Sequence, residues 1–164
     1  MASEKLTEEL RASEARFRSF AELLPETVFE ADTEGKVTVL NQSGMDKFGI
    51  TQALLDAGYY LTQGVVESEH NRVYSSLARV LAGETVSGLE FTGQHTSGET
   101  FPILVFATPV RNNGDVVGLR SIVVDITQQK AAERKVLHYQ GMLRQMDSQL
   151  QLTEERERCS LASD

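Results

Sequence analysis

Residues 116–136 read VVGLRSIVVDITQQKAAERKV, and they are the most informative about the fold. Its first half is rich in β-branched residues, which favour strands, whereas its second half is charged and favours a helix. A strand must therefore pass directly into a helix near Asp125, Ile126 and Thr127. Thr127 can cap the first free amides of the helix, and Asp125 places negative charge near the positive end of the helix dipole. These three residues join the last strand to a helix. An ordinary cap between a strand and a helix has the same local chemistry.

Two further long strands are expected before this one. Residues 85–95 (TVSGLEFTGQH) and 100–110 (TFPILVFATPV) have the two-residue period of strands. Asn112-Asn113-Gly114, which follows the second of them, is a strong hairpin signal. The second strand is apolar on both faces, with Phe101, Ile103, Val105 and Ala107 on one face and Leu104 and Phe106 on the other. Both faces of the sheet must therefore be covered, by helices or by a second copy of the chain.

The first half of the chain predicts a hairpin followed by small helices. Residues 27–32 (TVFEAD) and 36–41 (KVTVLN) are β-rich runs that flank Gly35, which allows the positive φ of a tight turn. Asn41 and Thr51 are suitable N-caps for two short helices. These residues therefore predict two antiparallel strands and two helices.

A longer helix is expected over residues 68–83. Ser68 opens it, Gly83 closes it, and its apolar stripe consists of Val73, Leu77, Val80 and Leu81. Two strands, several small helices and three strands thus follow one another along the chain. Sequential hairpins predict an antiparallel sheet with the helices on one side, which is an α+β architecture.

Amphipathic helices flank this part on both sides. In residues 1–24, apolar side chains recur at alternating spacings of four and three until Pro25 stops the helix. In residues 128–164 the same spacing forms a seam of Ala132, Val136, Tyr139, Leu143, Met146 and Leu150. A narrow seam is typical of a parallel two-stranded coiled coil, whereas a helix docked on a globule usually has a broader apolar face. We therefore expect three segments, with the globular domain at residues 25–127, and a homodimer.

Composition limits the possible partners and location. With a formal net charge of −8, the chain is repelled by phosphate backbones and anionic lipid, so we expect no nucleic acid or membrane partner. The apolar runs are far shorter than the ~20 residues that span a bilayer, and the N-terminus lacks the apolar core of an export signal. Cys159 is the only cysteine, which suits a reducing compartment. We expect a cytoplasmic protein.

The order of the elements and the residues at their joints resemble a PAS domain of the bacterial sensory type. The resemblance spans roughly residues 14–136, and the features in register are Asn41 after the second strand, SGE at 97–99, FPILVFATPVRN at 101–112, GDVVG at 114–118 and Asp125-Ile126-Thr127. It implies a five-stranded antiparallel sheet in the order 2-1-5-4-3 that cups small helices. It also implies that Asp125, Ile126 and Thr127 relay a signal from the sheet to the helix that follows.

The end of the chain resembles a more specific sequence. LTEERERCSLASD, residues 152–164, is similar to the helix that runs directly into the phosphoacceptor histidine in one subfamily of sensor histidine kinases. The matching residues are Glu155, Arg156, Glu157, Arg158, Leu161, Ala162 and Asp164. The resemblance implies a chain that ends just before this histidine, in a two-component sensor with downstream kinase domains and a response regulator as partners. A charged helix of this kind is also often only a solvated surface.

The residues that cofactors require in PAS domains are missing or displaced. Light-oxygen-voltage sensors need a cysteine beside the flavin, but Cys159 lies in the terminal helix, and the chain has no tryptophan to stack on a flavin ring. Haem needs an axial histidine on the long helix. His70 lies there, but about two residues before the position of the family's ligand. His95 and His138 belong to other elements, so we expect no haem, flavin or metal.

A pocket between the sheet and the small helices is the candidate site. Its candidate lining residues are Phe29, Val39, Asn41, Met45, Phe48, Tyr74, Leu77, Leu81, Leu89, Phe91, Ile103, Val105, Ile122 and Val124. The same set also describes a filled core. The sequence has no catalytic motif, so we expect no enzymatic activity within these residues.

These observations predict a PAS sensory and dimerisation module of a signal-transducing histidine kinase. It relays a small-molecule or conformational signal through its C-terminal coiled coil. Two alternatives stay open from the sequence. One is a PAS module that feeds a cyclic-dinucleotide enzyme, and the other is a structural dimerisation domain without a ligand.

Overall fold

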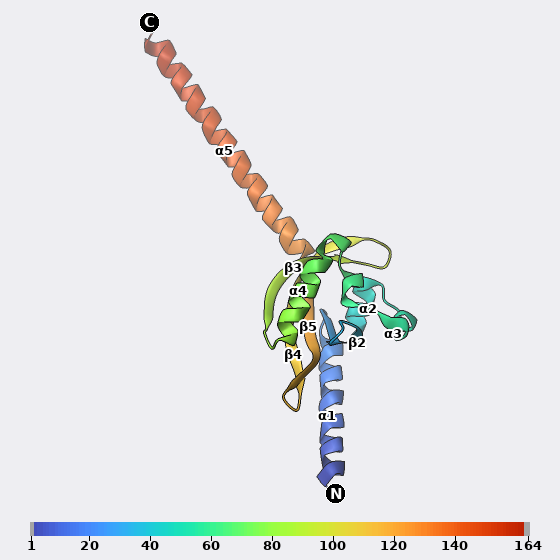
Figure 1. Cartoon of the computed structure of the whole chain (residues 1–164). Helices are drawn as coiled ribbons and strands as arrows, with labels where there is room; N and C mark the ends of the chain where they lie inside the picture. Colours follow the sequence, from blue (N-terminus) through green and yellow to red (C-terminus); the bar gives the residue numbers. More distant parts are fainter. Residues whose placement is uncertain (1, 163–164) are drawn as a thin grey trace. The chain divides into compact units, whose positions relative to one another are not determined.

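The computed structural model describes residues 2–162, with side chains for residues 3–159. The chain divides into two units, one of residues up to Ile126 and one of residues from Thr127 onward. In chain order the elements are α1 (Ala2–Leu23), β1 (Thr27–Asp32), β2 (Val37–Leu40), α2 (Gln42–Phe48), α3 (Gln52–Gly58), the 3₁₀ turns η1 (Leu61–Gly64) and η2 (Glu67–Glu69), α4 (His70–Leu81), β3 (Val86–Gln94), β4 (Thr100–Asn112), β5 (Asp115–Asp125) and α5 (Thr127–Ala162) (Figure 1).

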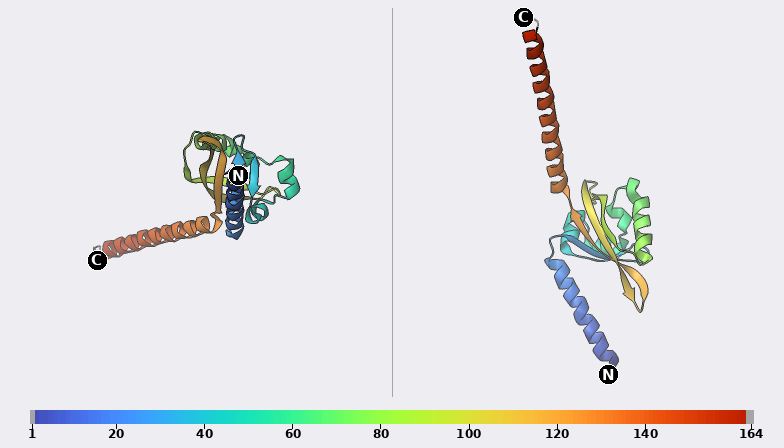
Figure 2. Two further views of the ribbon diagram at one scale, coloured as in Figure 1. Left: turned by 90° about the horizontal axis from the view of Figure 1, so that it is seen from below. Right: turned by 90° about the vertical axis from the view of Figure 1, so that its left-hand side faces the viewer.

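The sheet is antiparallel throughout, with the strand order β2-β1-β5-β4-β3, and this confirms the expected order. α4 lies along one side of the sheet (Figure 2, right), while α2 packs against β1 and α3 against β2. β5 is the middle strand and pairs with both β1 and β4. Because β5 is hydrogen-bonded along both edges, a change on either side of the sheet acts on it.

Both expected hairpins form, and local chemistry explains each turn. At the first, the Asp32 Oδ1 accepts hydrogen bonds from the amides of Glu34, at 2.9 Å, and Lys36, at 3.0 Å. At the second, Asn113 and Gly114 have positive φ angles of 52° and 86°. Two successive left-handed residues are what a two-residue type I′ turn requires, and asparagine and glycine tolerate this region best. The turn therefore fixes the pairing of β4 with β5.

The longest helix between α1 and α5 begins later than expected. α4 starts at His70, after the 3₁₀ turn Glu67–Glu69, so the assignment of Ser68 as its opening residue is wrong. The Glu69 carboxylate accepts hydrogen bonds from the amide and the hydroxyl of Thr92 on β3, at 2.6 Å and 3.2 Å. These hydrogen bonds to β3 hold the chain in a 3₁₀ turn directly before α4, and Glu69 makes no ordinary side-chain cap there.

Two clusters of buried apolar side chains fill most of the space between the inner face of the sheet and the helices. One includes Phe48, Tyr59, Phe91, Ile103 and Val123, and the other Ala31, Val80, Val86, Ala107 and Leu119. Val80 of α4 is almost completely buried, at 1% exposure. α4 thus closes the inner face of the sheet over its central and β3-side strands.

The outer face of the sheet is only partly covered. The guanidinium of Arg120 lies 3.9 Å from the centre of the Phe17 ring of α1 and pairs with the Glu30 carboxylate at 2.6 Å. Phe106 and Ile122 are direct partners on β4 and β5, and they remain 38% and 40% exposed. The end of α1 therefore packs near β1 and β5, while an apolar strip on β4 and β5 stays open within the described residues.

Candidate functional site

An apolar cavity of about 100 Å³ lies between the inner face of the sheet and the helices. All five strands contribute to its lining, together with α2, α4 and the segment between α3 and η2. Over the described residues, the lining contains no aspartate, glutamate, lysine, arginine or histidine. A charged molecule would lose its hydration in such a cavity without gaining an ion-pair partner. The cavity therefore suits an uncharged molecule.

The structure brings part of the candidate pocket together. Of the candidate residues, those that line the cavity are Phe29, Phe48, Leu77, Phe91, Ile103 and Val105. They come from three strands and two helices that lie far apart in sequence, and each occupies the inward position that its strand or helix period assigns. These residues form the aromatic and aliphatic wall of the site.

The remaining candidates do not line the cavity. They are Val39, Asn41, Met45, Tyr74, Leu81, Leu89, Ile122 and Val124. Ile122 and Val124 lie on the outer face because the inward positions of β5 are Leu119, Ser121 and Val123. β5 is apolar on both faces, and its inward row contains a serine. The prediction that Ile122 and Val124 line the pocket relied on hydrophobicity and is therefore wrong. Val39 likewise pairs with Glu30 and lies on the outer face.

Leu61, Val73 and Leu77 line both the cavity and a surface groove of about 60 Å³. These three side chains therefore form the wall between the cavity and the surface. Tyr74, one of the candidate lining residues, lies in the groove and is 57% exposed. Its hydroxyl belongs to the surface and not to the lining of the cavity.

Tyr59 is a cavity residue that the sequence analysis missed. It is 4% exposed, it lines the cavity, and its hydroxyl has no hydrogen-bond partner in the described part of the chain. Burial raises the pKa of Tyr59 to about 12, because the charged phenolate would lose its hydration. The residue follows α3 in an irregular segment, where no period indicates which side chains point inward. The only local indication is the preceding Gly58, which marks the end of α3.

The histidines do not converge on a common site. The Nε2 of His70 lies 2.9 Å from the carbonyl oxygen of Val65, and the Nδ1 of His95 lies 2.9 Å from the Ser97 hydroxyl. Neither histidine lines the cavity. Within residues 2–162, no group of three or more histidine, cysteine, aspartate or glutamate side chains is arranged to hold a metal ion.

The end of β5 is joined to α2 by an ion pair. The Lys47 Nζ lies 2.7 Å from the Asp125 Oδ2, and it also lies over the Phe101 ring, 5.6 Å from its centre. Phe101 in turn packs against the cavity residue Phe48, with 5.3 Å between the ring centres. The next residue, Ile126, is buried, and its amide donates to the carbonyl of Pro102 at 3.0 Å. A continuous set of contacts therefore connects the cavity wall with the last residues before Thr127.

The other end of α2 is held by Asn41, which the sequence indicates as its cap. The Asn41 Oδ1 accepts hydrogen bonds from the amides of Gly44 and Val28, both at 3.0 Å. Its Nδ2 donates to the carbonyls of Ala21, at 2.7 Å, and Glu26, at 2.8 Å. One buried amide therefore connects α1, β1 and α2, and its hydrogen-bonding groups are used within the fold and not directed at a ligand.

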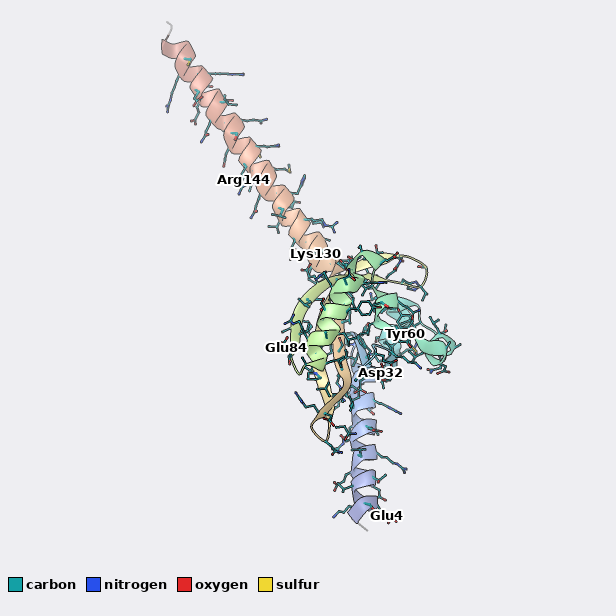
Figure 3. The ribbon with its side chains drawn as sticks, viewed as in Figure 1. Glu4, Asp32, Tyr60, Glu84, Lys130 and Arg144 are labelled. Carbon is teal, nitrogen blue, oxygen red and sulfur yellow. The ribbon has the colours of Figure 1, made fainter. Side chains whose placement is uncertain are left out.

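α5 is one continuous helix from Thr127 to Ala162. Figure 3 shows its side chains, Arg144 among them, projecting from all sides of the helix. All residues of the expected seam are exposed in the single chain. They are Ala132, Val136, Tyr139, Leu143, Met146 and Leu150. Of the residues that resemble the kinase sequence, Glu155 to Arg158 lie in this helix. The side chains of Leu161 and Ala162, and the whole of Asp164, lie outside the described part.

Among the helices of residues 2–162, none combines the length and the apolar content that crossing a lipid bilayer requires.

Several solved structures of domains from sensory proteins share this fold. A domain of a sensory box sensor histidine kinase/response regulator from Geobacter sulfurreducens is 22% identical, covers 71% of this chain and 96% of its own, and has a TM-score of 0.57. A sensory box histidine kinase/response regulator from Burkholderia thailandensis is 18% identical, with coverage of 79% and 98% and a TM-score of 0.59. The PAS domain of an HTR-like protein from Haloarcula marismortui is 17% identical, with coverage of 75% and 99% and a TM-score of 0.59. At these identities the likeness establishes the fold. No curated protein matches the chain.

A family model described as the PAS fold matches residues 21–131, which is more than half of the chain. Domains of this family are sensory modules and are usually non-catalytic. The family match agrees with the strand order β2-β1-β5-β4-β3 and with the small helices on the inner face. The chain therefore belongs to the PAS-fold family and contains a PAS sensory domain.

Proposed function

We propose that this chain is the sensory and dimerisation module of a cytoplasmic histidine kinase. It works as a homodimer and passes a small-molecule or conformational signal along α5 to downstream kinase domains and a response regulator. The observation that carries the proposal is the contact between Lys47 and Asp125, which links the helix that bears the cavity residue Phe48 to the end of β5. The proposal requires neither haem nor flavin.

The exposed seam of α5 supports a paired helix. Its larger side chains, from Val136 to Leu150, are 55–63% exposed in the single chain. Burying them against the same residues of a second copy removes apolar surface from water, and the alternating spacing fits a two-stranded coiled coil. Two paired helices would carry a rotation or a shift in register to the domain that follows.

The relay begins at the cavity. A ligand that contacts Phe48 and its neighbours would favour one position of α2, and therefore one state of the ion pair between Lys47 and Asp125. Both side chains are partly exposed, so the pair is weak enough to open. A ligand shifts such an equilibrium only by as much as its affinities for the two states differ. The structural neighbours from sensor histidine kinases support this output over a cyclic-dinucleotide enzyme.

Disulfide cross-linking tests the pairing of α5. In a Cys159→Ser background, Leu143→Cys places a thiol on the seam, and Ser148→Cys places one on the opposite side of the same helix. Under mild oxidation, the Leu143→Cys protein should form a covalent dimer at concentrations where the Ser148→Cys protein stays uncrosslinked. Equal cross-linking of the two variants, or none at the seam, would contradict a parallel paired helix.

A further inference from the structure

We propose that the cavity holds a small, neutral, mainly apolar ligand with one hydrogen-bond acceptor, and that the hydroxyl of Tyr59 donates to that acceptor. This inference rests on the proposed sensory function and names the chemical class of its signal. It adds a recognition residue to a cavity that is otherwise almost entirely apolar.

The hydroxyl of Tyr59 provides the first argument. Buried polar groups are nearly always hydrogen-bonded, and one that is not calls for an explanation. Over the described side chains, the Tyr59 hydroxyl is the buried side-chain nitrogen or oxygen that lacks a partner. With its pKa raised to about 12, it stays protonated near neutral pH and acts as a donor. A ligand acceptor would satisfy it.

The space beside this hydroxyl provides the second argument. A Cβ atom placed on Gly64 would lie 3.1 Å from the Tyr59 hydroxyl and 3.5 Å from the Phe48 ring. All three residues line the cavity, and glycine at position 64 allows the Tyr59 hydroxyl to lie close to the backbone in the cavity wall. An apolar cavity of roughly 150 Å³ is enough to hold benzene. At about 100 Å³, this cavity is smaller than that, so about six heavy atoms is the upper limit for its ligand.

The rest of the lining restricts the ligand further. Ser121, a polar residue of the lining, already donates its hydroxyl hydrogen to the carbonyl of Phe106 at 2.8 Å. The lining residues carry no charge to balance a carboxylate, a phosphate or an ammonium group. A ligand that fits this cavity therefore has one acceptor near Tyr59 and an apolar body against Phe48, Phe91 and Ile103.

Three ring compounds of similar size separate these requirements. Cyclopentanone is neutral and carries one carbonyl acceptor. Methylenecyclopentane has nearly the same shape without an acceptor, and cyclopropanecarboxylate, which also has six heavy atoms, carries a negative charge. Each is titrated into the full 164-residue protein while the amide signals of the cavity residues are followed by NMR. Cyclopentanone should bind most tightly and the carboxylate should not bind.

Variants then assign the preference to Tyr59. Tyr59→Phe removes only a hydroxyl that has no partner, so the protein should fold normally, and its affinity for cyclopentanone should fall about fivefold to tenfold. Its affinity for methylenecyclopentane should stay the same. Gly64→Ala places a methyl group against the Tyr59 hydroxyl and the Phe48 ring, and it should weaken the binding of both neutral probes. Tyr74→Phe removes an exposed hydroxyl outside the cavity and is the matched control.

Several results would overturn the inference. Equal affinities of the wild-type protein for the two neutral probes, or an unchanged cyclopentanone affinity in Tyr59→Phe, would mean that water satisfies the hydroxyl. No binding of either neutral probe would mean that the cavity is closed core. Tighter binding of the carboxylate would contradict a neutral ligand. None of these results affects cross-linking of α5, so they leave the proposed dimeric relay to its own test.

Discussion

Lys47 Nζ and Asp125 Oδ2 lie 2.7 Å apart, although 78 positions separate the two residues in the chain. The contact connects the last turn of α2 with the final residue of β5. The Lys47 side chain is 44% exposed and the Asp125 side chain 23% exposed. An ion pair this open to water contributes little to stability, so its position at the end of the central strand is its more informative property.

The first prediction separates the stability of this ion pair from its signalling role. Lys47→Ala should change the free energy of unfolding by less than about 1 kcal/mol, because the pair is partly exposed. In a fusion of residues 1–164, in register, to a histidine-kinase core, the variant should no longer couple cyclopentanone binding to autophosphorylation. Arg79→Ala, which removes a more exposed ion pair with Glu84, is the control and should keep the coupling. A normal response in Lys47→Ala would contradict the relay.

The second prediction concerns Tyr59 and alkaline pH. The folded-state pKa, about 12, is above the ordinary value of 10, so the folded protein disfavours the phenolate. This contribution to stability is fully present below pH 10 and is lost as the pH rises toward 12. Denaturant unfolding should therefore show a loss of about 1.4 kcal/mol by pH 11 that Tyr59→Phe lacks. At pH 7 the variant should be as stable as the wild type or about 1 kcal/mol more stable. Parallel pH profiles for the two proteins would show that the tyrosine is hydrated.

The third prediction compares two helix caps. Asn41→Ala removes a buried amide that makes four hydrogen bonds, and it should destabilise the protein by roughly 3–5 kcal/mol. Thr51 caps α3 through one hydrogen bond to the amide of Leu54, and Thr51→Ala should cost only about 1 kcal/mol. Urea unfolding of both variants checks the difference. Similar losses would mean that the contacts of Asn41 with α1 and β1 add little to its capping of α2.

The fourth prediction concerns the wall between the cavity and the surface groove. Leu77→Ala shortens a side chain that lines both, and it should destabilise the protein by roughly 2–4 kcal/mol. It should also speed the exchange of cyclopentanone, since the route between Leu61 and Val73 becomes wider. NMR line shapes in the titration report the exchange rate. Tyr74→Ala changes the groove alone and should leave the exchange rate unaltered. Slower exchange in Leu77→Ala would place the entry route elsewhere.

Much of the fold follows from local chemistry that the sequence displays. Turn residues such as Asn113 and Gly114, and the caps Asn41 and Thr51, determine where elements meet, and the structure confirms them. The strand period also places Ile103 inward and Phe106 outward correctly. Each of these assignments depends on residues close together in the chain.

The cavity is harder to predict because it depends on which row of a strand points inward. In β5, the outer Ile122 is more hydrophobic than the inner Ser121, so apolar content does not identify the buried row. Tyr59 lies in an irregular segment, and only the tertiary fold places it against Gly64. Its importance arises from an unsatisfied hydroxyl, which is a property of the folded environment that sequence alone does not contain.

The two ends of α2 give this short helix a role beyond packing. Its seven residues measure about 10 Å, with Asn41 tied to the end of α1 on one side and Lys47 tied to the end of β5 on the other. A displacement that arrives through the N-terminal helix would therefore reach the close of the central strand even when the cavity is empty. The domain would then respond to a movement of α1 as well as to a dissolved compound. Both signals would act through the same seven-residue helix.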